Sequence, residues 1–212
     1  MTQQRILWYF ADPMCSWCWG FAPVISAIKD RYAAQMKVAL VLGGLRPGTT
    51  EPMTPKSRDD ILHHWRDVRR VSGQPFQFDG AMPDGFIYDT EPPSRAVIAV
   101  AGINPDAVFP YFKAVQEAFY ARSEDITRRE TLAGLAQQRN IDRVRFLELF
   151  DSDGVKRKTR RQFEMARESG VRGFPTTVLQ DERGTTLLAD GYRSFDAVAP
   201  EIDKWLEKAK CA

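Results

Sequence analysis

The sequence predicts an α/β protein in which the two ends of the chain build one small sheet around a long helical segment. Two observations predict this. The chain begins as strand, helix and strand and ends as two strands and a helix, whereas its middle shows helical periodicity and no convincing strand. We therefore expect a βαβ…ββα domain made of residues 1–45 and 170–212, interrupted by a large all-helical insertion domain, residues 46–169.

The first half of the predicted sheet is a βαβ unit. Ile6 to Phe10 is a continuous apolar and aromatic run, typical of a strand covered on both faces. Apolar residues then recur at helical spacing from about Ser16 to about Ala34, and Val38 to Leu42 forms the second strand. At this length the two strands should lie parallel with a right-handed crossover.

The insertion is expected to be a series of capped helices. The proline-rich stretch from 46 to 55 leads out of the sheet. Ser57 is the expected N-cap of a helix through Val71, and Thr127 with Glu130 is the expected capping box of another helix. The remaining helices are expected near 91–102, 106–122, 142–150 and 153–169.

The sheet pattern resumes near the end of the chain. Thr176 to Gln180 and Thr185 to Ala189 are predicted to be antiparallel strands, because polar and glycine residues at 181–184 form a turn between them. A closing helix follows, with Phe195 and Leu206 near its two ends.

Charge and hydropathy limit the classes of partner. The chain carries 30 Lys and Arg against 28 Asp and Glu, so its net charge requires neither nucleic acid nor an anionic membrane. The basic stretch from Lys156 to Arg172 is interpreted as a solvated helix face. No apolar run is long enough to cross a bilayer, and the N-terminus lacks a signal-peptide pattern. If Met1 is the natural start, we expect a cytoplasmic protein.

The chemistry is expected at Cys15 and Cys18, which lie where the first strand meets the first helix. The unpaired N–H groups and the dipole at a helix N-terminus stabilise a thiolate. Cys15 is therefore expected to be the exposed, attacking sulfur. Cys18, three residues later on the same helical face, can close a disulfide with it or resolve a mixed one.

Zinc binding and inert core thiols are the alternatives for this pair. A structural zinc site needs four ligands. The chain offers three cysteines and two histidines; Cys211 is at the far C-terminus, and His63 and His64 are adjacent on a separate predicted helix. We therefore favour a working thiol couple and predict no metal site.

Residues 173–176, Gly-Phe-Pro-Thr, are the candidate second half of the site. Pro175 leads into an apparently interior strand, which is unusual because proline removes a ladder donor. The local sequence leaves a cis bond and an ordinary trans bond equally open. Beside the dithiol, the backbone of Phe174 could pair with an extended substrate peptide.

Several neighbours are candidate substrate contacts. Arg172 adjoins the proline loop and is expected to stabilise the Cys15 thiolate. Aromatic residues near both halves of the site are expected to rim an apolar substrate groove, although core packing explains some of them equally well: Trp17, Trp19, Phe21 and Phe174.

These motifs together resemble the thioredoxin fold. The resemblance rests on three features: the Cys-x-x-Cys that opens the first helix, Pro23 eight residues after the first cysteine, and the Gly-Phe-Pro-Thr stretch. The helical insertion and the string Asp-Pro-Met-Cys-Ser-Trp-Cys-Trp-Gly-Phe narrow the resemblance to the DsbA family and its cytosolic, FrnE-like predicted disulfide isomerases. The resemblance implies a thiol–disulfide oxidoreductase with Cys15 as nucleophile, Cys18 as resolving thiol and Pro175 as cis-proline.

The chain departs from the family pattern in two ways. The residues between the cysteines are Ser16 and Trp17, not the Pro-His of strongly oxidising periplasmic members. Ser16 can hydrogen-bond a thiolate but Trp17 brings no charge, so we expect a milder couple. Many relatives also carry a buried acid six residues before the first cysteine, where this chain has Tyr9. The group that assists proton removal from Cys18 is therefore left unidentified.

The predicted function is dithiol–disulfide exchange on protein, peptide or small disulfides, without a cofactor beyond the Cys15–Cys18 pair. Glutathione or a thioredoxin-type reductant is the expected co-substrate. The insertion also resembles that of kappa-class glutathione transferases and 2-hydroxychromene-2-carboxylate isomerases, which use a serine where this chain has Cys15. That activity is the enzyme alternative, and a peptide-binding module of thioredoxin fold is the non-enzyme alternative.

Overall fold

The sheet is mixed and four-stranded in the computed structural model, which describes residues 5–208. Its strand order is β2-β1-β3-β4, where β1 is Ile6–Ala11, β2 Lys37–Leu42, β3 Thr176–Asp181 and β4 Gly184–Asp190. Strand β1 pairs parallel with β2 and antiparallel with β3, and β3 pairs antiparallel with β4. The predicted α/β class and the parallel βαβ unit are confirmed.

The strand register brings the two candidate halves of the site together. Phe10 at the end of β1 lies opposite Thr176 at the start of β3. The residues that leave β1 and those that enter β3 therefore meet at one edge of the sheet, although they come from opposite ends of the chain.

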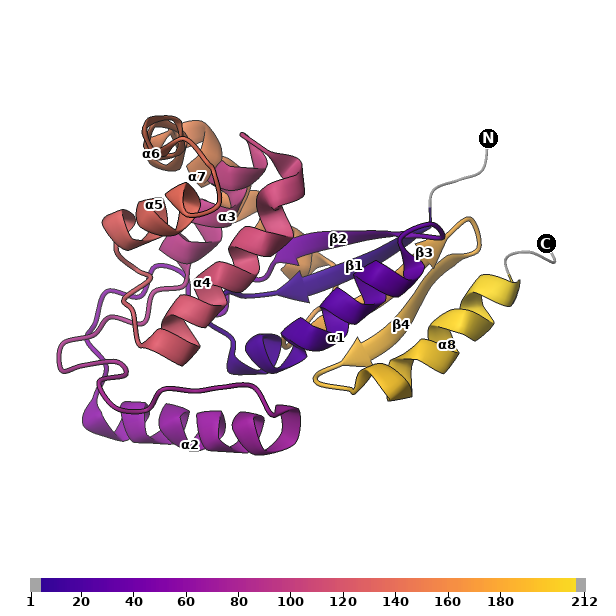
Figure 1. The fold of residues 1–212 in the computed structure, drawn as a ribbon, viewed down its shortest axis with the longest axis horizontal. Helices are drawn as coiled ribbons and strands as arrows, with labels where there is room; N and C mark the ends of the chain where they lie inside the picture. Colours follow the sequence, from indigo (N-terminus) through magenta and orange to yellow (C-terminus); the bar gives the residue numbers. More distant parts are fainter. Residues whose placement is uncertain (1–4, 209–212) are drawn as a thin grey trace.

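Helices cover both faces of this sheet (Figure 1). Helix α1 (Ser16–Tyr32) and helix α8 (Phe195–Lys208) pack on one face, and helix α7 (Asp153–Glu168) packs against β2 on the other. Because side chains alternate along a strand, Tyr9 joins the large core under α1 while Phe10 joins a smaller cluster with Ala166 of α7.

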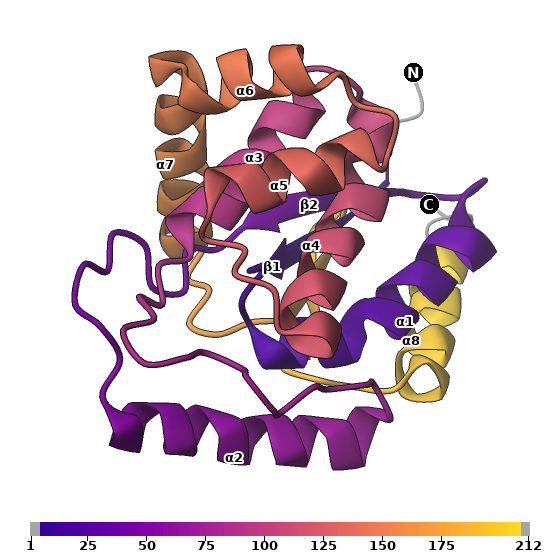
Figure 2. The same cartoon turned by 60° about the vertical axis from the view of Figure 1, so that its left-hand side comes forward.

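The helical segment lies between β2 and β3, as the sequence predicts. Figure 2 shows most of its helices beside the carboxyl ends of β1 and β2, with helix α2 along one side, where it packs against α1. Besides α7, its elements are α2 (Pro55–Ser72), α3 (Glu91–Ala101), the 3-10 turn Pro105–Ala107, α4 (Val108–Arg122), α5 (Arg129–Gln137) and α6 (Arg143–Asp151).

Both helix caps expected in the insertion are wrong. Thr54 caps α2 by accepting the N–H of Ser57, because Pro55 already occupies the first helical position. The Thr127 hydroxyl instead donates to the Asp125 carboxylate, so it does not cap α5. Within residues 5–208, no helix has the length and apolar character needed to cross a membrane.

Candidate active site

Cys15 sits at the junction of β1 and α1. It is the N-cap residue of α1, with extended backbone angles, and its carbonyl accepts the N–H groups of Cys18 and Trp19 at 3.0 and 3.1 Å. Its side chain therefore lies at the positive end of the helix dipole. Cys15 and Cys18 are both free thiols.

Cys15 is less accessible than expected. Cys15 is only 7% exposed and Cys18 is fully buried, so the expectation of an exposed Cys15 is wrong. The reason is that the loop before β3 lies over the end of α1. The order of accessibility still distinguishes the two thiols, because Cys15 alone of the pair has surface open to solvent.

The loop that covers Cys15 contains a cis peptide bond between Phe174 and Pro175. The Cys15 thiol donates a hydrogen bond to the Phe174 carbonyl, with 3.3 Å between sulfur and oxygen. Of the two readings that the local sequence left open, the cis bond is the one found. The two sequence-predicted halves of the site are in direct contact.

Two glycines after β2 allow close packing, Gly43 against the Phe174 loop and Gly44 against α7. The Phe174 ring lies so close to Gly43 that a Cβ added there would be 2.0 Å from the ring. A Cβ at Gly44, whose φ is +69°, would approach the Phe163 ring at 2.6 Å. Both packing roles depend on aromatic residues that are distant in sequence, Phe174 for Gly43 and Phe163 for Gly44.

Only some of the other residues expected at the site lie beside Cys15. Ser16 and Trp17 are half-buried beside Cys15, and the Trp17 ring lies 5.9 Å from the Tyr192 ring. Arg172 is exposed, and no hydrogen bond or ion pair found among residues 5–208 joins it to Cys15.

The expected aromatic rim is only partly present. Phe174 is half-buried, as Trp17 is, but Trp19 and Phe21 are 3% and 0% exposed and belong to the core. For these two residues, the core-packing alternative is the correct one.

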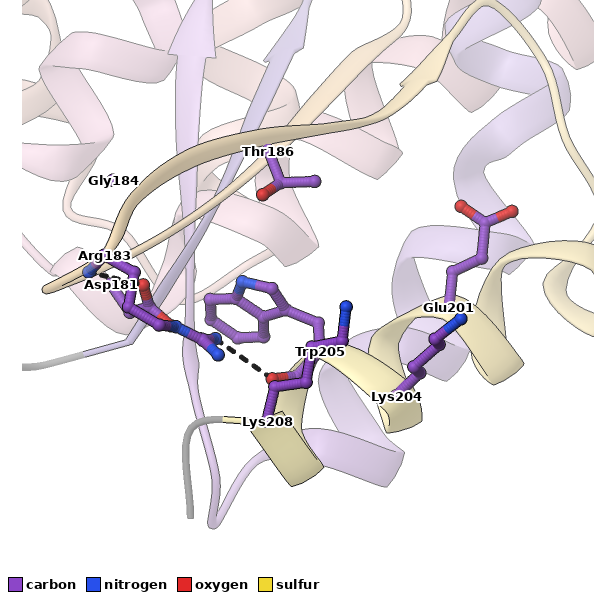
Figure 3. A pocket seen from close by; sticks show the side chains of 8 residues that line it. All are labelled: Asp181, Arg183, Gly184, Thr186, Glu201, Lys204, Trp205 and Lys208. Carbon is purple, nitrogen blue, oxygen red and sulfur yellow. Dashed lines mark hydrogen bonds and ion pairs between the residues drawn. The ribbon is translucent and has the colours of Figure 1, made fainter. Parts of the chain in front are cut away.

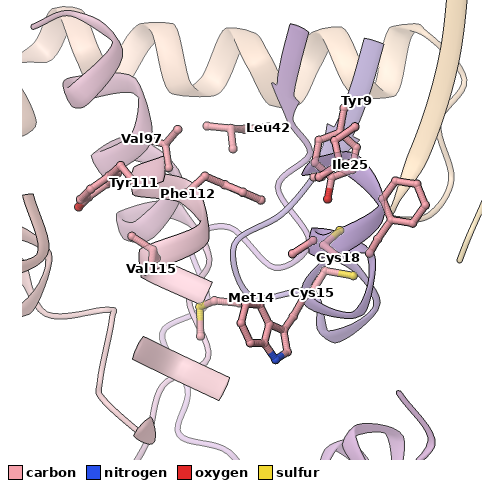
Figure 4. Close-up of a cluster of buried hydrophobic side chains, with 14 of the residues drawn as sticks. Tyr9, Met14, Cys15, Cys18, Ile25, Leu42, Val97, Tyr111, Phe112 and Val115 are labelled. Atoms are coloured by element: carbon pink, nitrogen blue, oxygen red, sulfur yellow. The ribbon is translucent and has the colours of Figure 1, made fainter. Parts of the chain in front are cut away.

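Buried polar groups surround Cys18. Figure 4 shows the Tyr9 hydroxyl pointing toward its sulfur. Burial raises the pKa of Cys18 well above its ordinary value, with Cys15 acting in the same direction. Burial, reinforced by both cysteines, likewise raises the pKa of Tyr9. Cys18 therefore holds its proton while the thiol pair is reduced.

Asp12 and Tyr88 are site neighbours that the sequence reasoning missed. Asp12 is fully buried three residues before Cys15, and its carboxylate accepts the Met14 N–H at 2.9 Å. Tyr88, on the loop before α3, donates a hydrogen bond to the Met14 carbonyl. The signal available for Asp12 was its place in the Asp-Pro-Met-Cys string; Tyr88 had no comparable signal.

The described cavities lie away from the dithiol. One of about 340 Å³ lies between the β3–β4 turn and the end of α8 and is lined by Arg183 and Trp205 (Figure 3). Because β3 runs antiparallel to β1, this is the opposite end of the sheet. A second, of about 400 Å³, lies between α1 and α4. Over the described residues, no three His, Cys, Asp or Glu side chains are grouped to hold a metal; Cys211 lies outside them.

Comparison with protein families finds a match over nearly the whole chain. Residues 6–203 match the model of the DsbA-like thioredoxin domain. The described motifs, from β1 to most of α8, all fall inside this range.

Comparison with solved structures gives the same fold. A proposed protein disulfide isomerase of Nitrosomonas europaea superposes with a TM-score of 0.91 at 44% identity, covering 97% of this chain and 98% of that one. The cytosolic disulfide reductase DsbM of Pseudomonas aeruginosa, solved with glutathione, gives a TM-score of 0.78 at 25% identity, covering 95% and 99%.

Curated relatives are more distant. The ClpXP adapter protein SpxH of Halalkalibacterium halodurans is 24% identical over 176 residues, which is 81% of this chain and 57% of that protein. SpxH of Bacillus subtilis is 21% identical over 177 residues, 80% of this chain and 56% of that protein. The chain thus spans little more than half the length of these relatives.

Proposed function

Because the chain belongs to the DsbA-like thioredoxin domain family, we propose that it is a thiol–disulfide oxidoreductase or isomerase working by dithiol–disulfide exchange. The observation that carries this proposal is the contact between the Cys15 thiol, at the start of α1, and the Phe174 carbonyl that precedes cis Pro175. With Cys18 three residues further along the helix, a nucleophile and a resolving thiol lie beside a loop that can position a substrate disulfide.

The proposed reaction has two exchanges. The Cys15 thiolate attacks one sulfur of a substrate disulfide, whose S–S bond breaks, and the first substrate thiol leaves with a proton. Cys18 then loses its proton and attacks the Cys15 sulfur, so that the Cys15–Cys18 disulfide forms and the second substrate thiol leaves. Two electrons pass from the cysteine pair to the substrate, and a thiol reductant must restore the pair.

Glutathione is the small thiol that we propose for this restoring step, with a thioredoxin-type protein as the alternative. The glutathione-bound structure of the P. aeruginosa relative supports the proposal. We place protein or peptide disulfides on the substrate side, the cytoplasm as the compartment, and Ser16, Trp17, Phe174, Pro175 and Arg172 around the substrate. We also keep the proposed domain division, with residues 46–169 as the insertion.

Reduction of insulin, followed by turbidity, tests the proposed activity. Cys15→Ser should lower the rate at least about 100-fold because the attacking atom is lost. Cys18→Ser should trap a mixed disulfide that mass spectrometry detects. Cys211→Ser removes a thiol outside the dithiol and is the matched control, expected to keep the wild-type rate. Equal rates for wild type and Cys15→Ser would refute the proposal.

The similarity to the SpxH adapters favours one second candidate, a protein-binding module. In that case the edge formed by Phe174 and Pro175 would hold a partner without electron transfer. Binding that is unchanged in Cys15→Ser, together with no insulin reduction by wild type, would support the module. Glutathione conjugation that survives Cys18→Ser would instead support the transferase alternative.

We propose that the Cys15–Cys18 pair is a less oxidising redox couple than that of the strongly oxidising periplasmic members, since Ser16 and Trp17 add no positive charge between the cysteines. A glutathione redox titration measures its potential. A value as oxidising as about −120 mV would contradict this part of the proposal.

A further inference from the structure

The cavity of about 400 Å³ lies between α1 and α4, which pack side by side (Figure 1). A volume of this order accommodates a small organic molecule. Its wall is apolar where Ile25 of α1 and Phe112 of α4 lie, and much of the remaining wall is polar or charged. Neither Cys15 nor Cys18 is among the described residues that line it. The cavity is therefore a candidate site separate from the dithiol.

Gln116 lies at the floor of this cavity with an unused amide. It has no exposed surface, less than any other residue of the wall. Neither its amide oxygen nor its amide nitrogen has a hydrogen-bond partner among the described residues. Buried amides are nearly always paired, because an unpaired one loses its hydration without compensation. No hydrogen bond holds the Gln116 amide in place, so it can turn toward the cavity without breaking one.

Lys29 brings a cation without an acid to the same cavity. Its side chain is half-buried, and its ammonium lies 3.6 Å from the centre of the Phe109 ring. No ion pair found between residues 5 and 208 includes Lys29. Burial lowers the pKa of Lys29, although the charges of Asp30 and Asp106 raise it. This ammonium has lost part of its hydration, which an anionic ligand can replace.

Two further cations make the cavity attractive to anions. Lys113 of α4 and Arg139, which follows α5, line its exposed part, and neither takes part in an ion pair found over the described residues. Of the two acids in the wall, Glu117 is bound to Arg122 at 3.3 Å, which leaves only Asp30. Three cations against one unpaired carboxylate favour a negatively charged ligand.

We propose that the cavity between α1 and α4 binds a small carboxylate that also carries an amide, of the N-acylated amino acid type. The three cations hold the carboxylate, and Ile25 and Phe112 contact the hydrocarbon part. Gln116 pairs with the ligand amide, because a glutamine side chain both donates and accepts and so complements another amide. The inference goes beyond the proposed function, since this binding uses neither thiol and transfers no electrons.

An NMR chemical-shift titration with N-acetyl-leucine tests the inference. The probe should shift resonances of α1 and α4 in a saturable way, with a Kd of about 1 mM for a ligand of this size. N-acetyl-leucinamide lacks the carboxylate and isocaproate lacks the amide, so each should bind about tenfold more weakly. Equal affinity for all three, or no saturable shift up to about 20 mM, would overturn the proposal.

Gln116→Leu keeps the size of the side chain but removes its amide. The variant should bind N-acetyl-leucine about tenfold more weakly and isocaproate within about twofold of wild type, because only the first ligand has an amide to pair. Its stability should not fall, since an apolar group replaces an unpaired buried amide. Equal weakening of both ligands would show that the residue acts through packing, and would overturn the proposed pairing.

Lys29→Met tests the charge independently of the floor of the cavity. It should weaken N-acetyl-leucine and isocaproate about tenfold and leave N-acetyl-leucinamide unchanged, because that ligand has no charge to pair. Lys37→Met removes a cation from the exposed start of β2, outside the cavity, and is the matched control that should bind all three ligands like wild type. Wild-type affinities in Lys29→Met would overturn the proposal.

Cys15→Ser separates this inference from the proposed function. It should bind N-acetyl-leucine with the wild-type affinity, because the cavity wall does not include Cys15. Loss of binding in this variant would place the ligand at the dithiol and overturn the inference. Failure of wild type to reduce insulin would instead refute the proposed function, whatever the titration of the cavity shows.

Discussion

Two buried aspartates at opposite ends of the sheet are treated differently by their surroundings. Asp181, at the end of β3, is bound by the Arg183 guanidinium, which also donates to the Trp205 carbonyl. The hydrogen bond from Arg183 lowers the pKa of Asp181, whereas burial raises that of Asp12 to about 6. The fold therefore pairs a cation with the buried carboxylate at the end of the sheet where β3 turns into β4.

The difference separates a stabilising carboxylate from a functional candidate. An aspartate whose pKa is lowered on folding stabilises the protein at neutral pH, and one whose pKa is raised destabilises it there. Uncompensated charge next to reactive groups is typical of functional sites. Asp12 lies next to the thiol pair, and Asp181 lies at the far end of the sheet from it.

The largest expected effect is on the pH dependence of stability. Because the folded pKa of Asp12 is raised from 3.8 to about 6, its contribution is most favourable below pH 4 and is lost as the pH rises through 6. The loss amounts to about 3 kcal/mol. Urea unfolding from pH 4 to 7 measures this decline in the free energy of unfolding. Asp12→Asn should not show it, whatever the stability of the variant at any single pH.

Asp181→Asn is the opposite control. The pKa of Asp181 is lowered from 3.8, so its stabilisation is present at neutral pH and is lost only as the pH falls through the folded pKa. The variant should be less stable than wild type at pH 7 and should keep the decline assigned to Asp12. If the free energy of unfolding of wild type and of Asp12→Asn changed with pH in parallel, the two carboxylates would not differ in the proposed way.

Gly43→Ala should have the next largest effect, at the dithiol end. The added Cβ would lie 2.0 Å from the Phe174 ring, which must move and take its carbonyl away from Cys15. We expect a stability loss of about 2 kcal/mol and an exchange rate lower by about tenfold. Gly173→Ala, on the same loop with open space around its Cβ position, should be nearly neutral in both urea unfolding and insulin reduction.

Arg183→Gln should make the surroundings of Asp181, at the hairpin end of the sheet, resemble those of Asp12. It leaves the Asp181 carboxylate, whose side chain is 1% exposed, without its cation. Stability at pH 7 should fall, but by less than in Gly43→Ala, since the Arg183 side chain is itself 31% exposed. Arg183→Lys keeps the charge and should recover part of it. Insulin reduction should not change, and a loss of that activity would show that the two ends are coupled.

The smallest expected effect is that of Leu45→Ala. Leu45 contacts Asp12 through its backbone N–H, and the residue is 41% exposed. Both stability and the redox equilibrium should stay within about 0.5 kcal/mol of wild type. A shift comparable with that of Asp12→Asn would mean that the side chain, and not the backbone, supports the carboxylate.

The sheet and the contact between its two loops were predictable because they depend on local patterns. The apolar run from Ile6 to Phe10 identified β1, and Cys-x-x-Cys with Gly-Phe-Pro-Thr identified two loops that strand pairing then places side by side. The cis state of Pro175 was predictable only through family resemblance. Local sequence does not distinguish it from a trans bond.

The burial of Cys15 and the packing of Gly43 were not predictable from one sequence. Both depend on where the Phe174 loop lies, and hence on contacts between residues more than 100 positions apart. The Thr127 cap was wrong for a local reason, because Asp125 competes for its hydroxyl. Asp12 was part of the quoted motif, but whether a cation accompanies a buried carboxylate is a property of the folded chain.

The hydrogen bond from the Cys15 thiol to the Phe174 carbonyl makes the loop responsive to oxidation. A disulfide sulfur has no hydrogen to donate, so forming the Cys15–Cys18 bond leaves that oxygen without its donor. The Phe174 carbonyl is therefore an occupied acceptor while Cys15 is a thiol, and closing the Cys15–Cys18 bond would free it.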